Sequence, residues 1–234
     1  MNSSRPFAAC PEARASIRDM KIWVFTDFDG TVSNPDTIDL LGKIFDRPSE
    51  RAVMRDRLAT GALKPSEWLA WEIGLVDAPL GKVLEFLRDV VVIDPTFPAF
   101  AGWCRKMGFP LTILSNGLEE IIRSLLSPFD LGELRLEANH LEEGKVPWKV
   151  VFKDGSAWGH DKSAYLKKSR IEGYAPVFVG DGVSDQEAAL CAEVLFAKGE
   201  LASICERIGL EYYPFASFED VRSVLEKVAG QARP

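Results

Sequence analysis

Histidine and cysteine are scarce in this chain. Its 234 residues include two histidines, His140 and His160, and four cysteines. So few imidazoles, with no HExxH pattern, exclude zinc hydrolases of that kind and histidine-rich metal sites. The cysteines, at positions 10, 104, 191 and 205, form no CxxC pair, which is typical of reduced thiols in a cytoplasmic protein. Any chemistry that this chain performs must therefore use carboxylates.

Clustered positive charge and long apolar stretches are also missing. The chain has 28 Lys and Arg against 35 Asp and Glu, a net charge of −7. We expect no nucleic-acid partner, because phosphate backbones bind grouped basic side chains. No apolar run approaches the ~18 residues of a membrane span, and residues 1–20 lack the apolar core of a secretory signal. A cytoplasmic protein without a membrane partner is expected. P-loop, GxGxxG and GxSxG motifs are absent too, which excludes the common nucleotide-binding and serine-hydrolase sites.

Short apolar runs alternate with helical patterns along most of the chain. Hydrophobic residues make up 47% of it and charged residues 27%, as in an ordinary folded protein. Runs rich in β-branched and aromatic residues predict strands over 21–26, 109–114, 176–179 and 194–197, and two more strand–helix steps complete the chain. Val146, Val150 and Val151 suggest an antiparallel pair within 134–151. Strands alternating with helices predict an α/β fold with a Rossmann-like, doubly wound parallel sheet.

One block of the sequence is purely helical. Asn34, Pro35 and Asp36 resemble a helix start, with Asn34 as the cap and Pro35 at the first helical position. From there to about residue 92 the apolar residues keep helical spacing, and Pro65 and Pro79 stand at helix starts. We therefore divide the chain into an N-terminal tail (1–20), a core domain (21–36 and 94–228) and an inserted helical layer (37–93).

Polar side chains stand where three of the predicted strands end. Asp27 and Asp29 follow the first strand, Ser115 the second, and Asp181 and Asp185 the third. An Asp after a strand is by itself most often a turn former or a helix cap. Parallel sheets, however, bind ligands beyond the carboxyl ends of their strands, so the recurrence of polar residues at these ends indicates one site.

The acidic residues of this predicted site would repel one another. If Asp27, Asp181 and Asp185 converge, each like-charge pair at about 4 Å costs on the order of 4 kcal/mol at an effective dielectric constant of 20. Three such pairs would rival the ~5–15 kcal/mol by which a whole domain is stable. A divalent cation must be present, or some carboxylates must be protonated. Oxygen ligands without a nearby histidine favour Mg²⁺ over zinc.

These motifs, taken in order, resemble those of the haloacid dehalogenase superfamily of phosphohydrolases. Asp27-Phe28-Asp29-Gly30-Thr31 is similar to the first motif of that family, and Ser115-Asn116-Gly117 to the second. Lys162 is similar to the third, although Lys145, Lys167 and Lys168 are available substitutes. The stretch from Gly180 to Asp185 is similar to the fourth motif, so the resemblance covers about residues 23–189.

The resemblance implies a role for each motif residue. Asp27 would attack phosphorus and form an aspartyl-phosphate, while Asp29 would protonate the leaving oxygen and then deprotonate water. Mg²⁺ would be held by Asp27, the backbone carbonyl of Asp29 and Asp181, with Asp185 steadying its waters. Ser115, Asn116, Gly117 and Lys162 would bind the phosphate oxygens. The family's dehalogenases lack a carboxylate at the position of Asp29, and its transport ATPases carry Thr there, so Asp29 favours a phosphatase or a phosphotransferase.

The helical layer at 37–93 resembles the small cap of the phosphoserine phosphatase branch. That branch holds serine with a Glu nine residues after the nucleophile and an Arg on a cap helix. Here Asp36 stands at the first position and Ala70 at the second, so the carboxylate clamp is lost and phosphoserine becomes a weaker expectation. Trp68 and Trp71 are expected either to pack between helices, which we favour, or to contact substrate.

A narrower resemblance points to the methionine-salvage phosphatases of 2-hydroxy-3-keto-5-methylthiopentenyl-1-phosphate. It rests on Asp36, the 181–189 stretch, Asn139-His140 and Leu195-Phe196-Ala197. The expected partner is thus a small phosphorylated metabolite, bound by a monomer or homodimer. Three alternatives stay open: a phosphotransferase, a phosphoserine phosphatase in which Arg51, Arg55 or Arg57 reaches the pocket, and a non-enzymatic phospho-aspartate signalling module.

Overall fold

A parallel sheet forms the centre of the molecule. The computed structural model describes residues 21–132 and 134–230, so the predicted tail lies outside the described residues. The sheet has the order β6-β5-β4-β1-β7-β8-β9. Its neighbours are parallel from β5 to β9, and β6 is antiparallel to β5, which confirms the predicted fold class and the antiparallel pair. The strands are β1 (Lys21–Thr26), β4 (Leu111–Leu118), β5 (Arg135–Leu141), β6 (Val150–Val151), β7 (Tyr174–Gly180), β8 (Val194–Ala197) and β9 (Tyr213–Pro214).

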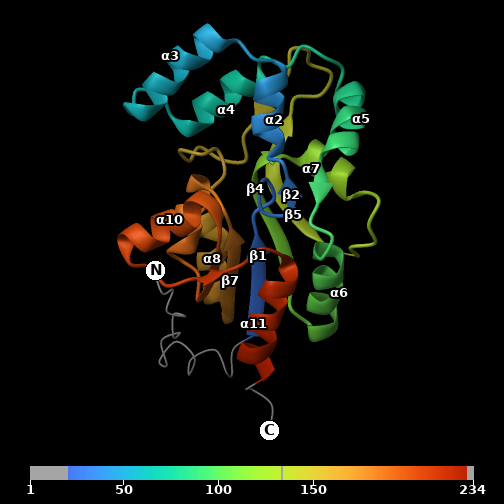
Figure 1. Cartoon of the computed structure of the whole chain (residues 1–234), viewed down its shortest axis with the longest axis vertical. Coiled ribbons are helices and arrows are strands. Elements are labelled where there is room, and N and C mark those ends of the chain that lie inside the picture. Colours follow the sequence, from blue (N-terminus) through green and yellow to red (C-terminus); the bar gives the residue numbers. More distant parts are fainter. Residues whose placement is uncertain (1–20, 133, 231–234) are drawn as a thin grey trace, which may run out of the picture.

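Both faces of this sheet are buried, because successive side chains of the central strands enter two different cores. In β1, Val24 belongs to one cluster and Phe25 to the other, and Val177 and Phe178 divide in the same way in β7. Helices cover both faces (Figure 1). On the face of Val24 lie α6 (Phe97–Met107), α7 (Glu119–Leu126) and α11 (Phe218–Gly230), and on the face of Phe25 lie α8 (Lys162–Ile171), α9 (Gln186–Ala189) and α10 (Gly199–Ile208).

The helical insertion lies at the end of the sheet where β1 stops (Figure 1). It begins and ends at a two-stranded ribbon, in which Ser33 pairs with Ile93 and Asn34 with Val92. Between these strands, β2 (Ser33–Asn34) and β3 (Val92–Ile93), come α2 (Thr37–Ile44), α3 (Pro48–Ala59), α4 (Pro65–Ile73) and α5 (Leu80–Val90). The division of the chain at residues 37 and 93 remains our interpretation.

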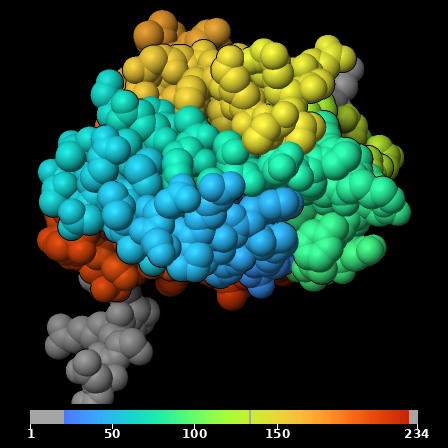
Figure 2. Space-filling model, turned by 90° about the horizontal axis from the view of Figure 1, so that it is seen from above, coloured from blue at the N-terminus to red at the C-terminus, as the bar shows by residue number. Residues whose placement is uncertain are grey.

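The cap, by which we mean helices α2 to α5, is fastened to the segment that follows β5. The backbone N–H of Ser66 donates to the carbonyl of Ala157 over 2.9 Å, and that of Trp148 donates to Val76 over 3.0 Å. The Trp148 indole donates to the carbonyl of Ala78 over 2.8 Å. Seen from above in Figure 2, the cap in blue to green and this segment in yellow together cover the end of the molecule.

Three local expectations were wrong. The cap of α2 is Asp36, whose carboxylate accepts from the N–H of Asp39, because Asn34 is taken up by the ribbon. Strand β4 runs on through Ser115-Asn116-Gly117 to Leu118, since its edge is extended by pairing with Asn139 of β5. After β8 the described residues contain one further strand, β9, and two helices rather than two complete strand–helix steps.

Within the described residues, no helix combines the length and the apolar character that crossing a bilayer requires.

Candidate active site

The loop after β1 carries the first two aspartates. Asp27 is 6% exposed, and its backbone N–H donates to the carbonyl of Val179 on β7, which fixes the loop to the sheet. Phe28, fully buried, anchors the turn in the core. Gly30 follows at a φ of 75°, and a side chain there would collide with the carboxylate of Asp181. The turn therefore needs glycine both for its backbone and for the close approach of Asp181.

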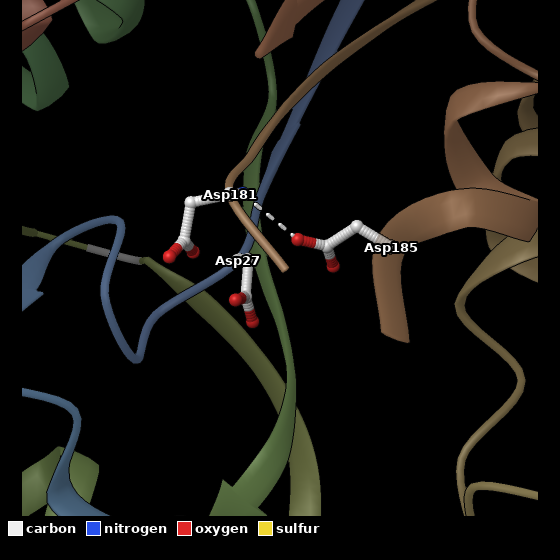
Figure 3. A group of neighbouring side chains, drawn as sticks. All are labelled: Asp27, Asp181 and Asp185. Atoms are coloured by element: carbon white, nitrogen blue, oxygen red, sulfur yellow. Dashed lines mark hydrogen bonds between the residues drawn. The ribbon is translucent and has the colours of Figure 1, made fainter. Parts of the chain in front are cut away.

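Three carboxylates converge at the ends of β1 and β7. Ligand oxygens of Asp27, Asp181 and Asp185 lie within 4.8 Å of one another. Figure 3 shows Asp27 and Asp181 extending the same way from adjacent strands, with Asp185 reaching in from the 3-10 turn Val183–Asp185. Asp185 accepts the backbone N–H groups of Asp181 and Gly182 over 3.0 and 3.2 Å. Thr31 donates to Asp181 over 2.7 Å. The acidic convergence predicted from the strand ends is present.

Lys162 joins two of these carboxylates. Its ammonium lies 2.7 Å from Asp27 Oδ1 and 2.7 Å from Asp185 Oδ1, and the residue is 3% exposed. Burial by itself would lower the pKa of Lys162, but the charges of Asp185 and Asp27 outweigh burial and raise it, so the ammonium stays charged. Among the four lysines considered from the sequence, Lys162 is the one beside the carboxylates. The others bond elsewhere: Lys145 to Glu142, Lys167 to Ser163 and Lys168 to Glu172.

Asp27 experiences opposing influences. Burial and the charges of Asp185 and Asp181 raise its pKa well above the usual value, while Lys162 acts in the opposite direction. Burial likewise raises the pKa of Asp181 to about 6, against the hydrogen bond from Thr31. One ammonium is thus too little positive charge to keep three crowded carboxylates ionised, and a cation among them would relieve the repulsion.

Asp29 lies in a different environment from Asp27. Its Oδ1 accepts from the backbone N–H and the hydroxyl of Thr37 over 2.8 and 2.6 Å, whereas its buried Oδ2 has no hydrogen-bond partner among the residues that the structure describes. Burial and the nearby charge of Asp36 raise the pKa of Asp29 to about 7, and the bonds from Thr37 oppose this shift. Its side chain is not a member of the acidic triad.

The end of β4 supplies the Ser115-Asn116-Gly117 stretch. Ser115 is 1% exposed, and its hydroxyl accepts the N–H of Gly117 over 2.9 Å. A side chain at Gly117 would lie 2.5 Å from Asp29 Oδ2, so only glycine lets the two approach. The Asn116 amide donates to the carbonyls of Trp158 and His160, both over 3.3 Å, and its Oδ1 has no hydrogen-bond partner within 21–132 and 134–230.

His160 supports the site from behind. Its Nδ1 lies 2.9 Å from the carbonyl oxygen of Ser115, and the residue is 2% exposed. It therefore contacts the β4 stretch, while Asp161 caps α8 through the N–H of Ala164. His140 lies elsewhere, 3.4 Å from Glu119 and 43% exposed.

A cavity of about 300 Å³ separates the carboxyl ends of β1, β4 and β7 from the cap. The structure brings Asp27, Asp29, Asp181 and the Ser115-Asn116-Gly117 stretch to its wall, while Lys162 and Asp185 are buried beside that wall. The remaining lining, mainly from the cap, comprises Asp36, Ile38, Asp39, Arg51, Arg55, Pro65, Trp68, Leu69, Glu72, Trp158, Gly182 and Ser184.

The cap residues considered from the sequence divide into two groups. Asp36 and Trp68 line the cavity, whereas Trp71 does not and packs against Trp68 with ring centroids 5.3 Å apart. Of the three arginines, Arg51 and Arg55 reach the cavity and Arg57 does not. Ala70 is not part of the lining either. Sequence reasoning missed Glu72, which lies on the same helix two residues further on, and Trp158, which lies in a loop without periodicity.

Comparisons with known proteins point to one family. Residues 24–190 match the family model described as haloacid dehalogenase-like hydrolase. Pdp3-interacting factor 1 of Schizosaccharomyces pombe is 32% identical over 222 residues, covering 89% of this chain and 96% of that protein. Polyol phosphate phosphatase PYP1 of Saccharomyces cerevisiae is 29% identical, with 89% and 94% covered. The 2-hydroxy-3-keto-5-methylthiopentenyl-1-phosphate phosphatase of Brevibacillus brevis is 25% identical, with 89% and 96% covered.

Solved structures show the same fold. A phospho-aspartyl intermediate analogue of phosphoserine phosphatase superposes with a TM-score of 0.65 at 22% identity, covering 89% of this chain and 99% of that one. A probable phosphoserine phosphatase from Vibrio cholerae gives a TM-score of 0.69 at 22% identity, with 92% and 68% covered.

Proposed function

The chain belongs to the haloacid dehalogenase-like hydrolases and is a phosphoric monoester hydrolase, and on that premise we propose that Asp27 is its nucleophile. Oδ of Asp27 would bond to phosphorus as the ester P–O bond breaks, giving an aspartyl-phosphate. The proton on Asp29 would pass to the leaving oxygen. Water would then attack the phosphorus, return a proton to Asp29 and release phosphate and Asp27.

This assignment rests on the contrast between two neighbouring carboxyl groups that line one cavity. Asp27 is 2.7 Å from the ammonium of Lys162, whose charge opposes the rise in the pKa of Asp27 that burial, Asp185 and Asp181 cause. Asp29 has one unpartnered oxygen and a pKa raised to about 7, so it can hold a proton at neutral pH and give it up. Two carboxyl groups whose environments differ in this way can take different catalytic roles, here nucleophile and proton donor.

The acidic triad fits a hard divalent cation, because its donors are all carboxylate oxygens from three places in the fold. Asp27, Asp181 and the backbone carbonyl of Asp29 would hold Mg²⁺, with Asp185 orienting its waters. When bound, the ion would offset the negative charge of the phosphoryl group. Ser115, Asn116, the N–H of Gly117 and Lys162 would bind the phosphoryl oxygens.

The substrate is proposed to be a small phosphorylated metabolite of a size suited to the 300 Å³ cavity. Relatives named for polyol phosphates and for the methionine-salvage enol phosphate support an ester without a carboxylate. A methionine-salvage substrate therefore remains our narrower candidate from the sequence, and phosphoserine is the weaker one. Transfer of the phosphoryl group to an alcohol would use the same intermediate. The signalling-module alternative is set aside, since the family is one of hydrolases.

Phosphate release from p-nitrophenyl phosphate and a panel of metabolite phosphates, with Mg²⁺ or with EDTA, tests this proposal. Asp27→Asn should abolish turnover, because the amide is a poor nucleophile. Asp89→Asn, an exposed position on α5, is the matched control and should leave the rate unchanged. Turnover by Asp27→Asn, or full activity in EDTA, would contradict the proposal. Added alcohol acceptors, with product analysis, separate transfer from hydrolysis.

A further inference from the structure

The cap end of the cavity carries charges of its own, separate from those that surround the phosphate. Asp36, Arg51 and Glu72 form its inner part, and Arg51 and Glu72 are 8% and 5% exposed. Asp39 and Arg55 are exposed and stand at the rim, where Asp39 also pairs with Lys43 over 2.6 Å. Charges at the rim are screened by solvent, so the inner three decide what the cap end accepts.

Arg51 and Glu72 form an ion pair that links three helices of the cap. The guanidinium of Arg51 on α3 contacts Glu72 Oε1 on α4. A side chain at Gly42 on α2 would collide with both groups. Glu72 Oε2 accepts the indole N–H of Trp68 over 3.0 Å, and Arg51 Nε lies 3.3 Å from Asp46 Oδ1. Both carboxylate oxygens of Glu72 thus already have donors.

This pairing changes what Arg51 can bind. Two carboxylates already surround its guanidinium, so a carboxylate on the substrate would be the third. The inner charges, Asp36 and Glu72 against Arg51, sum to −1, which repels an anionic group. Arg51 nevertheless lines the cavity, and Glu72 takes only its Nη2 while Nε faces Asp46, so the N–H groups of Nη1 are left for a neutral oxygen.

An ammonium group would find little to bind at the same place. Glu72 is bonded to Arg51 and Trp68, and Asp36 caps α2 through the N–H of Asp39. What remains is the N–H groups of Arg51 Nη1 and the second lone pairs of carboxylate oxygens. A hydroxyl group both donates and accepts, and so matches this set.

We propose that the cap end selects phosphate esters with an uncharged, hydroxylated body, and that the Arg51–Glu72 pair excludes substrates bearing a carboxylate. This inference rests on the proposed function and adds a specificity-determining pair to it. Glu72 contributes to this selectivity in two ways: it pairs with Arg51, and its negative charge repels a carboxylate on the substrate.

Four substrates in two matched pairs test the inference. In the first pair, 3-phosphoglycerate has a carboxylate where glycerol 3-phosphate has a hydroxymethyl group. In the second pair, phosphoserine has a carboxylate that ethanolamine phosphate lacks. With Mg²⁺, kcat/KM should be at least about tenfold higher for the member without the carboxylate in each pair, and highest for glycerol 3-phosphate. This minimum corresponds to about 1.4 kcal/mol of discrimination.

Two variants test the residues. Glu72→Gln removes one charge and releases Arg51, so kcat/KM for 3-phosphoglycerate should rise and the preference for glycerol 3-phosphate should narrow about tenfold. Asp36→Asn is the second variant, for the case that Glu72→Gln is unstable. It also removes one negative charge, and it should keep the fold because Asn serves equally well as a helix cap. Glu50→Gln, at an exposed position of α3, is the matched control and should leave the ratio unchanged.

The outcomes separate the two proposals. No phosphate release from any substrate, including p-nitrophenyl phosphate, would overturn the proposed function. Hydrolysis with equal rates within each pair, or a ratio unchanged in both variants, would overturn the inference alone. Preference for ethanolamine phosphate over glycerol 3-phosphate would show selection of a cation and would also overturn it.

Discussion

Lys162→Met tests whether one ammonium holds the acidic cluster together. The substitution keeps most of the apolar volume of the side chain and removes the charge. In the folded protein Asp27 and Asp185, 8% and 0% exposed in their side chains, would lose their shared cation. Asp185 would keep its two backbone donors, whereas Asp27 would be left beside two other carboxylates.

The expected loss follows from burial. Removing one partner of a buried ion pair costs about 3–5 kcal/mol, because an unpaired charge stays in the interior. Here one ammonium serves two carboxylates, so we expect the upper part of this range in the free energy of unfolding. A domain of this size is stable by ~5–15 kcal/mol, so the variant should fold but unfold at clearly lower urea.

Urea unfolding in EDTA measures this loss, with Lys168→Met, an exposed position, as the control. The double variant Lys162→Met/Asp185→Asn should recover part of the loss, since it removes one of the unpaired charges. Mg²⁺ should stabilise Lys162→Met more than the unaltered protein, because the ion replaces the missing charge, and 100 Kd of ligand adds about 2.7 kcal/mol. A loss below about 1 kcal/mol in EDTA would refute the reasoning.

Two further predictions concern the acid and the buried histidine. Asp29→Asn should lower kcat by about 10²–10⁴ with circular dichroism unchanged, because a positioned proton donor is lost; a near-normal kcat would mean that another group donates the proton. Burial lowers the pKa of His160 below 6.5, so under pH 6.5 the unfolded chain binds a proton that the folded chain does not. The contribution of His160 to the free energy of unfolding should therefore fall from pH 7 to pH 5, by up to about 1.4 kcal/mol per pH unit, while the raised pKa values of Asp29 and Asp181 act in the opposite direction. Urea titrations of the unaltered protein and of His160→Gln isolate this contribution, because the carboxyl groups are common to both; a stability difference that does not change with pH would contradict the assignment.

The sequence predicted the convergence of the acidic residues, because a parallel sheet places the carboxyl ends of its strands together. Asp27 and Asp181 follow β1 and β7, Ser115 lies near the end of β4, and β1 lies between β4 and β7 in the sheet. Their convergence needs only the strand pattern and the rule for such sheets. The choice of Lys162 among four lysines needed the structure, since three-dimensional distance and not helix position distinguishes them.

The cap was predicted only as a helical layer. Helical spacing says which residues share a face but not which face meets the cavity, so Glu72 was missed. Ala70 was considered because it stands where the phosphoserine phosphatase branch has its Arg. The sequence placed the cap of α2 at Asn34 instead of Asp36, because both residue types are good helix caps. Only the pairing of Asn34 with Val92 shows that Asn34 belongs to the ribbon and that Asp36 is the cap. Trp158 lies in a loop, where no periodic pattern carries information.

The cap and the chemistry share hydrogen bonds through the first turn of α2. Thr37, the first residue of this helix, donates both its N–H and its hydroxyl to Asp29 Oδ1, and so holds the other oxygen of that carboxyl beside Gly117. Asp36 caps the same turn, and its charge is one of the influences that raise the pKa of Asp29. A movement of α2 would therefore alter the orientation and the protonation of the acid together. If the substrate body contacts Asp36, as we propose, that contact would act on Asp29 by this route, because Asp36 is adjacent to Thr37.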